Sequence, residues 1–414
     1  MNKAINLQNF IWAILIYVFA FQRALLAVSI VFSYIDELLA IYAVFSLLIR
    51  MVSGQKIHKD ELIILALLLL LIVIGVIGNV SFGIFTNTYS IIIDIISTTK
   101  VWLSYFLVII QNWKKDALDN LIQDIACIAR VLVWILFGCL LISQVVDINM
   151  SGGVRYGIKA FKFLFDNAGN CSKLFYFLVP VLTADLYYKK TTYKKMVIGV
   201  ALFVWLFTLR SRAIAFIAIY ILVMFFTGIK KNQTIKLKFI YVVPILLVAV
   251  LLTWDQIVFY FDSDTQARAV LFKYGLITLK DFFPIGAGFG TYGSDIAKTN
   301  YSKLYHKYGF NRIYGMSENT AYYLNDNYWP MIMGQFGLLG LIVTVTVLFL
   351  FMKRVLKDLN TNKYFYLAGL FALGWLMLSS VASKSYSEFS TICVFLFVGL
   401  LVKKMRFEEQ EKSI

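Results

Sequence analysis

The chain contains 414 residues, of which 60% are hydrophobic and only 15% are charged. A water-soluble domain carries roughly 25% charged residues, so the composition excludes a soluble globular protein and predicts an all-α integral membrane protein. The net charge of +16 would suit a nucleic-acid-binding protein, but Lys and Arg also accumulate on the cytoplasmic loops of membrane proteins, and no nucleic-acid partner is expected.

In chain order, apolar stretches long enough to cross a bilayer predict about twelve transmembrane helices in one polytopic membrane domain. This domain covers residues 1–414. The first apolar stretch lacks a small-residue cleavage site and leads into further apolar stretches, so no cleavable signal peptide is expected. The predicted spans are residues 10–32, 36–50, 61–78, 90–111, 125–146, 172–188, 195–209, 212–229, 237–253, 328–352, 363–381 and 388–403.

Basic residues alternate between the predicted loops. One set of loops, together with both termini, holds 22 of the 39 basic residues, whereas three short loops of the other set contain Lys384 alone. Because basic loops stay in the cytoplasm, both termini are predicted to be cytoplasmic. The loops 147–171 and 254–327 are then extracytoplasmic, and the expected location of this multi-pass protein is the cytoplasmic (inner) membrane.

The loop 254–327, between the ninth and tenth predicted helices, is too long to be a simple connection. It carries many aromatic residues, which predicts that it folds, lies on the membrane interface or stacks on a ligand. Apolar residues recur at helical spacing over residues 266–283, so we expect a helix there that lies along the membrane surface. The main feature outside the membrane is therefore a partly helical outer loop.

Arginines on the predicted outer face are the first candidates for a site. Arg210 and Arg212 lie in the tight link Leu209-Arg-Ser-Arg-Ala213 between two apolar helices. Arg155 lies in the shorter outer loop, and Arg268 opens the predicted surface helix. Guanidinium groups bind phosphate oxygens with paired hydrogen bonds, so these residues together predict a site for an anionic lipid. The alternative is that each side chain only reaches the membrane interface or forms a local ion pair.

A glycine-rich segment, Pro284-Ile-Gly-Ala-Gly-Phe-Gly-Thr-Tyr-Gly293, follows the predicted surface helix. Its residues Gly286, Gly288 and Gly290 permit close approach of the backbone and could aim N–H groups at a phosphate. No strand–turn–helix context surrounds the segment and no Gly-Lys-Ser/Thr follows it, so it is not a nucleotide-binding signature. A structural turn that returns the chain to the membrane is an equally good interpretation.

The large outer loop also holds three acid–base candidates, His306, Glu318 and Asp326. Each could take a proton from a sugar hydroxyl, but a solvated surface residue, a helix cap or an Arg partner is the alternative role. Tyr301 and Tyr305 precede His306, and such rings could stack on a sugar. The four Cys lack the spacing of a zinc site or of a disulfide framework, and neither a metal nor a cofactor is expected.

Arg23, Asp94 and Lys100 fall inside predicted spans. A charge in the membrane is costly unless it pairs or faces a cavity, and transporters use such residues. These residues keep a transporter of lipid-linked sugars open as an alternative. A transporter is expected to show pseudo-repeats and discontinuous helices, however, and neither is clear in this sequence.

Four features occur in a fixed order along the chain. This order resembles the O-antigen polymerase and ligase superfamily, and most closely its Wzy-type polymerases of surface polysaccharide. The resemblance covers residues 150–345 by motif and the rest of the chain by hydropathy only. The features are the Arg155 loop with its Asn-rich end, Leu-Arg-Ser-Arg-Ala, Arg268 followed by Pro-x-Gly-x-Gly-x-Gly, and the Tyr-rich loop that ends in Asn325-Asp-Asn-Tyr-Trp-Pro330 before Gly334-Gln-Phe-Gly-Leu-Leu-Gly340.

The resemblance implies transfer of a growing glycan from undecaprenyl diphosphate to the next lipid-linked repeat unit, without a metal, in O-antigen or capsule biosynthesis. It implies that Arg155, Arg210, Arg212 and Arg268 hold diphosphates and stabilise the leaving group. His306, Glu318 or Asp326 would then activate the acceptor hydroxyl. The implied partners are undecaprenyl-diphosphate-linked oligosaccharides and the bilayer, with a chain-length regulator and a flippase as further candidates.

The closest alternative within the superfamily is the O-antigen ligase, which passes the glycan to a lipid A core sugar. Ligases place a His followed by Asn, Ser or Gln ahead of a glycine cluster in the large loop. Here Lys307 follows His306, and the glycine cluster comes first. This departure favours the polymerase.

Overall fold

The computed structural model describes residues 7–53, 57–155, 157–229 and 266–412. About three quarters of the described residues are helical. Two short antiparallel strands, β1 (Ser151–Arg155) and β2 (Ile158–Phe161), form a hairpin in the loop between α5 and α6. The α-helices are α1 (Leu7–Leu25), α2 (Ile35–Val52), α3 (Lys59–Phe82), α4 (Thr88–Ile110), α5 (Lys115–Val145), α6 (Ala168–Asp185), α7 (Thr192–Leu206), α8 (Ser211–Ile229), α10 (Ala267–Asp281), α11 (Asp295–Thr299), α12 (Lys303–Lys307), α13 (Tyr328–Leu359), α14 (Lys363–Ser380) and α15 (Ile392–Lys412).

The prediction of a mainly helical fold is confirmed. The hydropathy of these helices indicates a membrane-embedded protein. Within the described residues, α1, α3, α4, α5 and α13 are long and apolar enough to cross a membrane. The predicted spans fall on helices wherever the chain is described, while the predicted span 237–253 lies outside the described residues. The total of twelve spans therefore remains a prediction.

One helix ends earlier than its sequence suggests. The first predicted span runs to residue 32, but α1 ends at Leu25. In the last turn of α1, the Gln22 side chain donates hydrogen bonds to the Phe32 carbonyl at 2.7 Å and to the Asp36 carboxylate at 2.8 Å. These bonds fold residues 26–34 into a short connection to α2, since a buried amide must satisfy its donors.

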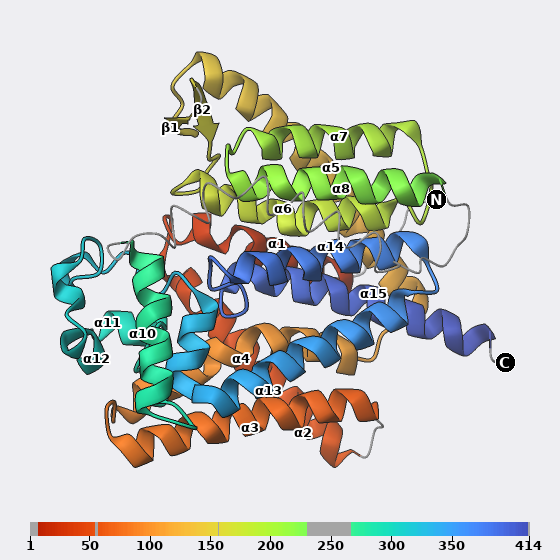
Figure 1. Ribbon diagram of the computed structural model, residues 1–414. Coiled ribbons are helices and arrows are strands. Elements are labelled where there is room, and N and C mark those ends of the chain that lie inside the picture. The colour runs from red at the N-terminus through yellow and green to blue at the C-terminus, as the bar shows by residue number, and fades with distance from the viewer. Residues whose placement is uncertain (1–6, 54–56, 156, 230–265, 413–414) are drawn as a thin grey trace.

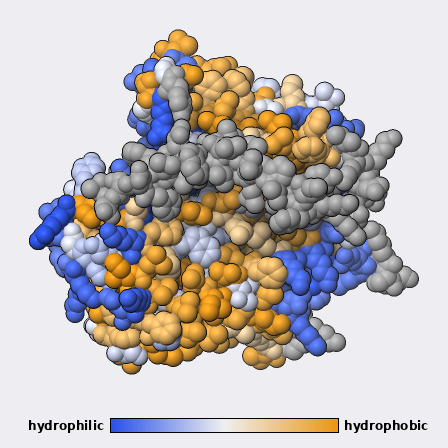
Figure 2. All heavy atoms as spheres, in the orientation of Figure 1, coloured by the Kyte–Doolittle hydropathy of each residue, from blue (hydrophilic) through white to orange (hydrophobic). Residues whose placement is uncertain are grey.

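Apolar side chains face outward as well as inward. On α3, for example, the Leu69 side chain is 61% exposed. This helix also has the highest mean hydropathy of the five candidate spans. Figure 2 shows hydrophobic side chains over the middle of the helices and hydrophilic side chains gathered at both ends. This distribution is typical of helices that contact lipid around the middle of the bundle.

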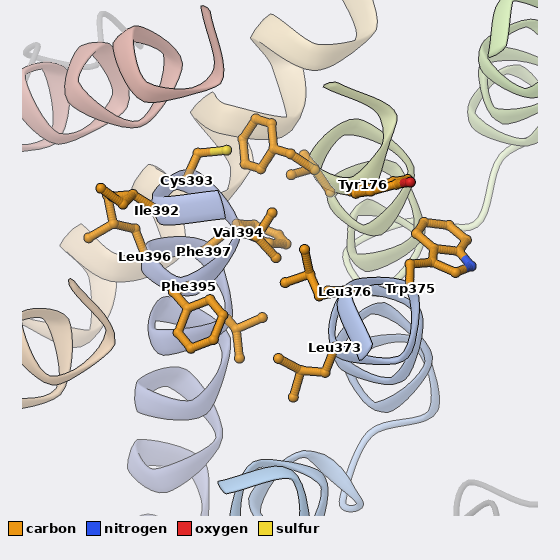
Figure 3. Close-up of a cluster of buried hydrophobic side chains, with 14 of the residues drawn as sticks. Tyr176, Leu373, Trp375, Leu376, Ile392, Cys393, Val394, Phe395, Leu396 and Phe397 are labelled. Carbon is orange, nitrogen blue, oxygen red and sulfur yellow. The ribbon is translucent and has the colours of Figure 1, made fainter. Parts of the chain in front are cut away.

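Aromatic and aliphatic side chains fill the centre where α6, α14 and α15 meet (Figure 3). Tyr176 of α6 faces Trp375 of α14, and Val394 and Phe397 of α15 lie beside them. The Trp205 ring of α7 stacks on Phe175 with ring centroids 5.7 Å apart. This packing fixes the positions of the helix ends that carry the polar groups of the candidate site.

The two ends of the bundle differ in their chemistry. At one end, Arg406 of α15 pairs with Glu61 of α3 and with Asp358 of α13, and Lys404 pairs with Asp119 of α5. The other end carries the β1–β2 hairpin and α10, α11 and α12 (left in Figure 1), whereas α15 ends on the right. The helix predicted over residues 266–283 is confirmed as α10, which runs crosswise to α3 and α13 in Figure 1. Its place along the membrane surface remains a prediction.

The charged residues in the predicted spans have partners in the structure. The Lys100 ammonium contacts the Asp36 carboxylate at 2.5 Å, and both side chains are less than one tenth exposed. Asp94 accepts hydrogen bonds from the Gly290 N–H at 2.7 Å and from the Gln335 side chain at 2.9 Å. Partners of this kind reduce the cost of placing a charge away from water.

Candidate functional site

A polar cavity of about 600 Å³ lies at the end of the bundle that carries α10. Helices α1, α6, α8, α10 and α11 contribute to it, together with the segment before α13 and the loop between α14 and α15. Seven basic and three acidic side chains line it, an excess of four positive charges. The lining residues are Arg23, Asn167, Gly169, Asn170, Lys173, Arg210, Arg212, Arg268, Asp295, Lys298, Tyr322, Tyr323, Asn325, Asp326, Ala382, Ser383, Lys384 and Glu388.

The link between α7 and α8 presents two of the arginines. Leu209 adopts a left-handed backbone (φ 51°), which is costly for a branched residue and directs the chain abruptly into α8. The link is held by β2, because the Phe161 N–H donates to the Phe207 carbonyl at 2.8 Å. Arg210 and Arg212 then follow at the cavity wall.

Helix N-termini add to the positive potential of the cavity. The first turn of α6 is capped by the Asn167 side chain, which accepts a hydrogen bond from the Asn170 N–H at 3.0 Å. A Cβ added to Gly169 would lie 3.6 Å from the Arg210 guanidinium carbon, so this arginine lies over the helix start. The N-terminus of α8 lies at the same wall, because Arg212 is in its first turn. Both ends favour a bound anion.

The opposite wall comes from the large outer loop. Arg268, in the first turn of α10, approaches the Asp326 carboxylate at 3.6 Å. Asn325 donates a hydrogen bond to Asp295 at the start of α11. Lys384, in the loop between α14 and α15, contacts both Asp295 oxygens at 2.6 Å. These contacts join the large loop to the helix bundle.

The floor of the cavity contains a buried ion pair. Lys173 of α6 donates to both Glu388 oxygens, at 2.6 and 2.7 Å. Arg23, in the last turn of α1, contacts Asp166 at 3.3 Å. Several cations of the cavity therefore already face a carboxylate, and an anionic ligand would bind among groups that are held in place by these pairs.

The three acids of the cavity differ in proton affinity. Burial raises the pKa of Asp326 above its usual value, and the nearby Arg268 guanidinium offsets this only in part. Burial also acts on Asp295, but the Lys384 ammonium more than compensates and holds the pKa of Asp295 well below its usual range. Glu388 accepts hydrogen bonds on both oxygens from Lys173, which favours its charged form. Asp326 is thus the cavity carboxylate best suited to accept a proton.

Four of the residues predicted from sequence line the cavity, namely Arg210, Arg212, Arg268 and Asp326. Arg155 does not line it, but its guanidinium lies 3.5 Å from the Leu209 carbonyl and so contacts the link that carries Arg210 and Arg212. Arg155 is exposed at the end of β1.

Other predicted site residues lie elsewhere in the large loop. Tyr301 and Tyr305 are 4% and 0% exposed and pack with Phe310 in the core of this loop. His306 packs its ring edge against Tyr301, with centroids 4.8 Å apart. Glu318 is exposed at the start of a short 3₁₀ helix. Neither His306 nor Glu318 lines the cavity.

The glycine-rich segment acts as a structural turn. The N–H groups of Gly286, Gly288 and Gly290 donate to Phe282, Gln335 and Asp94, at 2.8, 2.9 and 2.7 Å respectively. With φ +92°, Gly288 lies so close to α3 that an added Cβ would be 2.4 Å from the Asn79 backbone nitrogen. The donors proposed for a phosphate are therefore used inside the protein, and the segment wedges the outer loop between α3 and α13.

Sequence reasoning missed several polar residues of the cavity. Lys173 and Glu388 lie in or beside predicted spans, and their pairing across 215 residues of sequence has no local signal. Lys298 was one of many basic residues of the long loop. Lys384 did carry a signal, because it is the one basic residue in three otherwise neutral short loops on the predicted outer face.

Neither a protein-family model nor a curated protein matches this chain.

Proposed function

We propose that the protein is a membrane glycosyltransferase that polymerises a surface polysaccharide. It transfers a growing glycan from undecaprenyl diphosphate to the next lipid-linked repeat unit. The main support is the cavity with its excess of four positive charges, in which Arg210, Arg212 and Arg268 meet from separate parts of the chain. The ordered motifs that resemble Wzy-type polymerases contain these three arginines and Asp326.

The cavity has the chemistry that a diphosphate leaving group requires. When the anomeric carbon–oxygen bond of the donor breaks, negative charge develops on the undecaprenyl diphosphate. Guanidinium and ammonium groups at fixed positions stabilise this charge without reorganisation. The Arg212 Nη1 atom is buried and has no hydrogen-bond partner within the described residues. A phosphate oxygen would supply that partner.

Asp326 is our candidate for the general base. In the proposed step, an acceptor hydroxyl attacks the anomeric carbon, its proton passes to the Asp326 carboxylate, and the bond from the anomeric carbon to the diphosphate oxygen breaks. The raised pKa of Asp326 suits it to accept this proton. Its neighbour Arg268 lies 3.6 Å away and can contact the leaving group on the same side of the cavity.

The proposal places the cavity on the outer face of the cytoplasmic membrane and the basic end of the bundle in the cytoplasm. The distribution of Lys and Arg among the short loops supports this orientation. An alkaline phosphatase reporter inserted after the exposed Asn311 is expected to be active, because this enzyme folds only outside the cytoplasm. A reporter after Asn360, between α13 and α14, is expected to be inactive. The reverse pattern would reject the orientation.

A gene deletion tests the proposed reaction directly. We expect the deletion strain to lose the ladder of long surface glycans on a gel and to retain acceptors that carry a single repeat unit. Plasmid-borne wild-type protein is expected to restore the ladder. Loss of all attached repeats would indicate a ligase or a flippase instead, and an unchanged ladder would exclude all three activities.

A further inference from the structure

The aromatic residues in the described part of the large loop differ in exposure, and four of them are exposed, namely Phe283, Tyr314, Tyr322 and Tyr323. Most pack inside the loop: Tyr292, Tyr305 and Phe310 are 0% exposed. Tyr322 and Tyr323, in contrast, are 62% and 38% exposed. They are also the only aromatic side chains among the described residues that line the charged cavity. Their position therefore requires an explanation other than packing of the loop core.

The backbone holds this tyrosine pair in a defined place. The Tyr323 N–H donates to the Gly315 carbonyl at 3.1 Å, and the Tyr322 N–H donates to the Thr320 carbonyl at 2.8 Å. The Tyr323 ring lies directly against Gly315, because a Cβ at that glycine would be 2.4 Å from the ring. The two tyrosine rings meet edge to face, with centroids 6.4 Å apart and an interplanar angle of 69°. The Tyr323 ring thus has a fixed place against Gly315, and the Tyr322 ring lies beside it.

The pair is connected to the candidate base. The Asp326 N–H donates to the Tyr323 carbonyl at 3.2 Å, so the tyrosines and Asp326 belong to one tight turn. A ligand group that rests on the rings would therefore lie near the carboxylate. The charged walls suit a diphosphate, whereas exposed rings offer an apolar face that a phosphate does not need.

We infer that Tyr322 and Tyr323 form a sugar-stacking surface that positions the acceptor repeat unit beside Asp326. This inference rests on the proposed function and adds a subsite to it. The C–H groups on one face of a pyranose are weakly positive and pack on the negative face of an aromatic ring. Stacking of this kind fixes the plane of a sugar, so the pair would orient the acceptor hydroxyl toward the base.

Binding of two lipids to purified full-length protein in detergent tests this inference. The probes are undecaprenyl diphosphate and the undecaprenyl-diphosphate-linked repeat unit isolated from the deletion strain. Tyr322→Ala is expected to weaken binding of the sugar-bearing lipid roughly tenfold, relative to wild type, and to change binding of undecaprenyl diphosphate less than about twofold. Tyr322→Phe, which keeps the ring, is expected to bind both lipids like wild type.

Tyr314 provides a matched control. It belongs to the same loop and is 84% exposed, but it does not line the cavity. Tyr314→Ala is expected to bind both lipids like wild type. Each variant is compared with wild type by thermal unfolding. Tyr323→Phe, which keeps the ring over Gly315, is expected to bind both lipids like wild type.

Several results would overturn the inference while leaving the proposed function intact. These are unchanged binding of the sugar-bearing lipid by Tyr322→Ala, an equal loss for both lipids, an equal loss in Tyr322→Phe, or an equal loss in Tyr314→Ala. An equal loss for both lipids would indicate that the rings anchor the loop at the membrane interface. Failure of the wild-type protein to bind undecaprenyl diphosphate would instead overturn the proposed function, and the sugar-stacking surface with it.

Discussion

Replacement of Arg268 by alanine is expected to abolish long polysaccharide chains while single repeat units remain attached to their acceptor. In the proposed reaction, Arg268 stabilises charge that develops on the departing diphosphate, and removal of one such group typically costs about 10²- to 10³-fold in rate. The measurement is the glycan ladder of a strain that carries only the variant, together with turnover of the purified variant on the isolated lipid-linked repeat unit.

Two further variants show whether the effect belongs to this position. Arg268→Lys keeps the charge but loses the paired donors of the guanidinium, so partial activity is expected. Arg312→Ala removes an exposed arginine of the same loop that does not line the cavity, and it should leave the ladder unchanged. Normal long chains from well-expressed Arg268→Ala protein would contradict the assignment.

The pH dependence of Arg268→Ala gives an independent check. The Arg268 guanidinium lowers the pKa of Asp326, against the larger opposing effect of burial. Its removal should therefore raise this pKa further. Because a general base works only when it is deprotonated, the residual activity should fall at a higher pH than in wild type as the solution is acidified. A pH profile identical in shape to that of wild type would show that Arg268 does not influence the protonation of Asp326.

Replacement of Asp326 by asparagine is the second change with a large expected effect. Asparagine keeps the shape of the side chain but cannot accept the proton, so turnover should fall by about 10²- to 10⁴-fold. Binding of undecaprenyl diphosphate should remain, because the cations of the cavity are unchanged. The measurement is the kcat and KM of the purified variant, where a loss confined to kcat is expected.

The control for this change is Asp281→Asn. Asp281 is an exposed carboxylate at the end of α10 that pairs with Lys307 at 2.9 Å and does not line the cavity. This variant should retain full turnover. Asp326→Glu keeps a carboxylate, so it should retain part of the activity. This activity should also decline as the solution is acidified. An active Asp326→Asn protein would move the role of the base to another residue, with Glu318 and His306 as the remaining candidates from the sequence.

The sequence predicts the helices well for a physical reason. A span needs an uninterrupted apolar stretch, and this property is local, so the eleven predicted segments that fall within the described residues coincide with helices. The end of α1 was harder to predict from the sequence, because it depends on hydrogen bonds from Gln22 to Phe32 and Asp36 on a neighbouring segment. Helix boundaries are set by such contacts between segments as much as by hydropathy.

Residues of the candidate site could be predicted from the sequence only where the residue type is unusual for its position. Arg210 and Arg212 stood out because short loops on the predicted outer face rarely carry arginine. Lys173 and Lys298 carried no such signal, since lysines at helix ends and in long loops are common. Aromatic density predicted that the large loop folds, but it did not distinguish Tyr301 and Tyr305, which are buried, from Tyr322 and Tyr323, which are exposed on the cavity.

The basic side chains of the cavity come from segments that span most of the chain, from Arg23 to Lys384. No single fragment could bring these charges together, so anion recognition emerges only when the whole bundle has closed. Closure brings like charges near one another, and this repulsion opposes it. A phosphate-bearing lipid would act as the counter-ion that completes the assembly, and occupied protein should consequently resist heat and proteases better than empty protein.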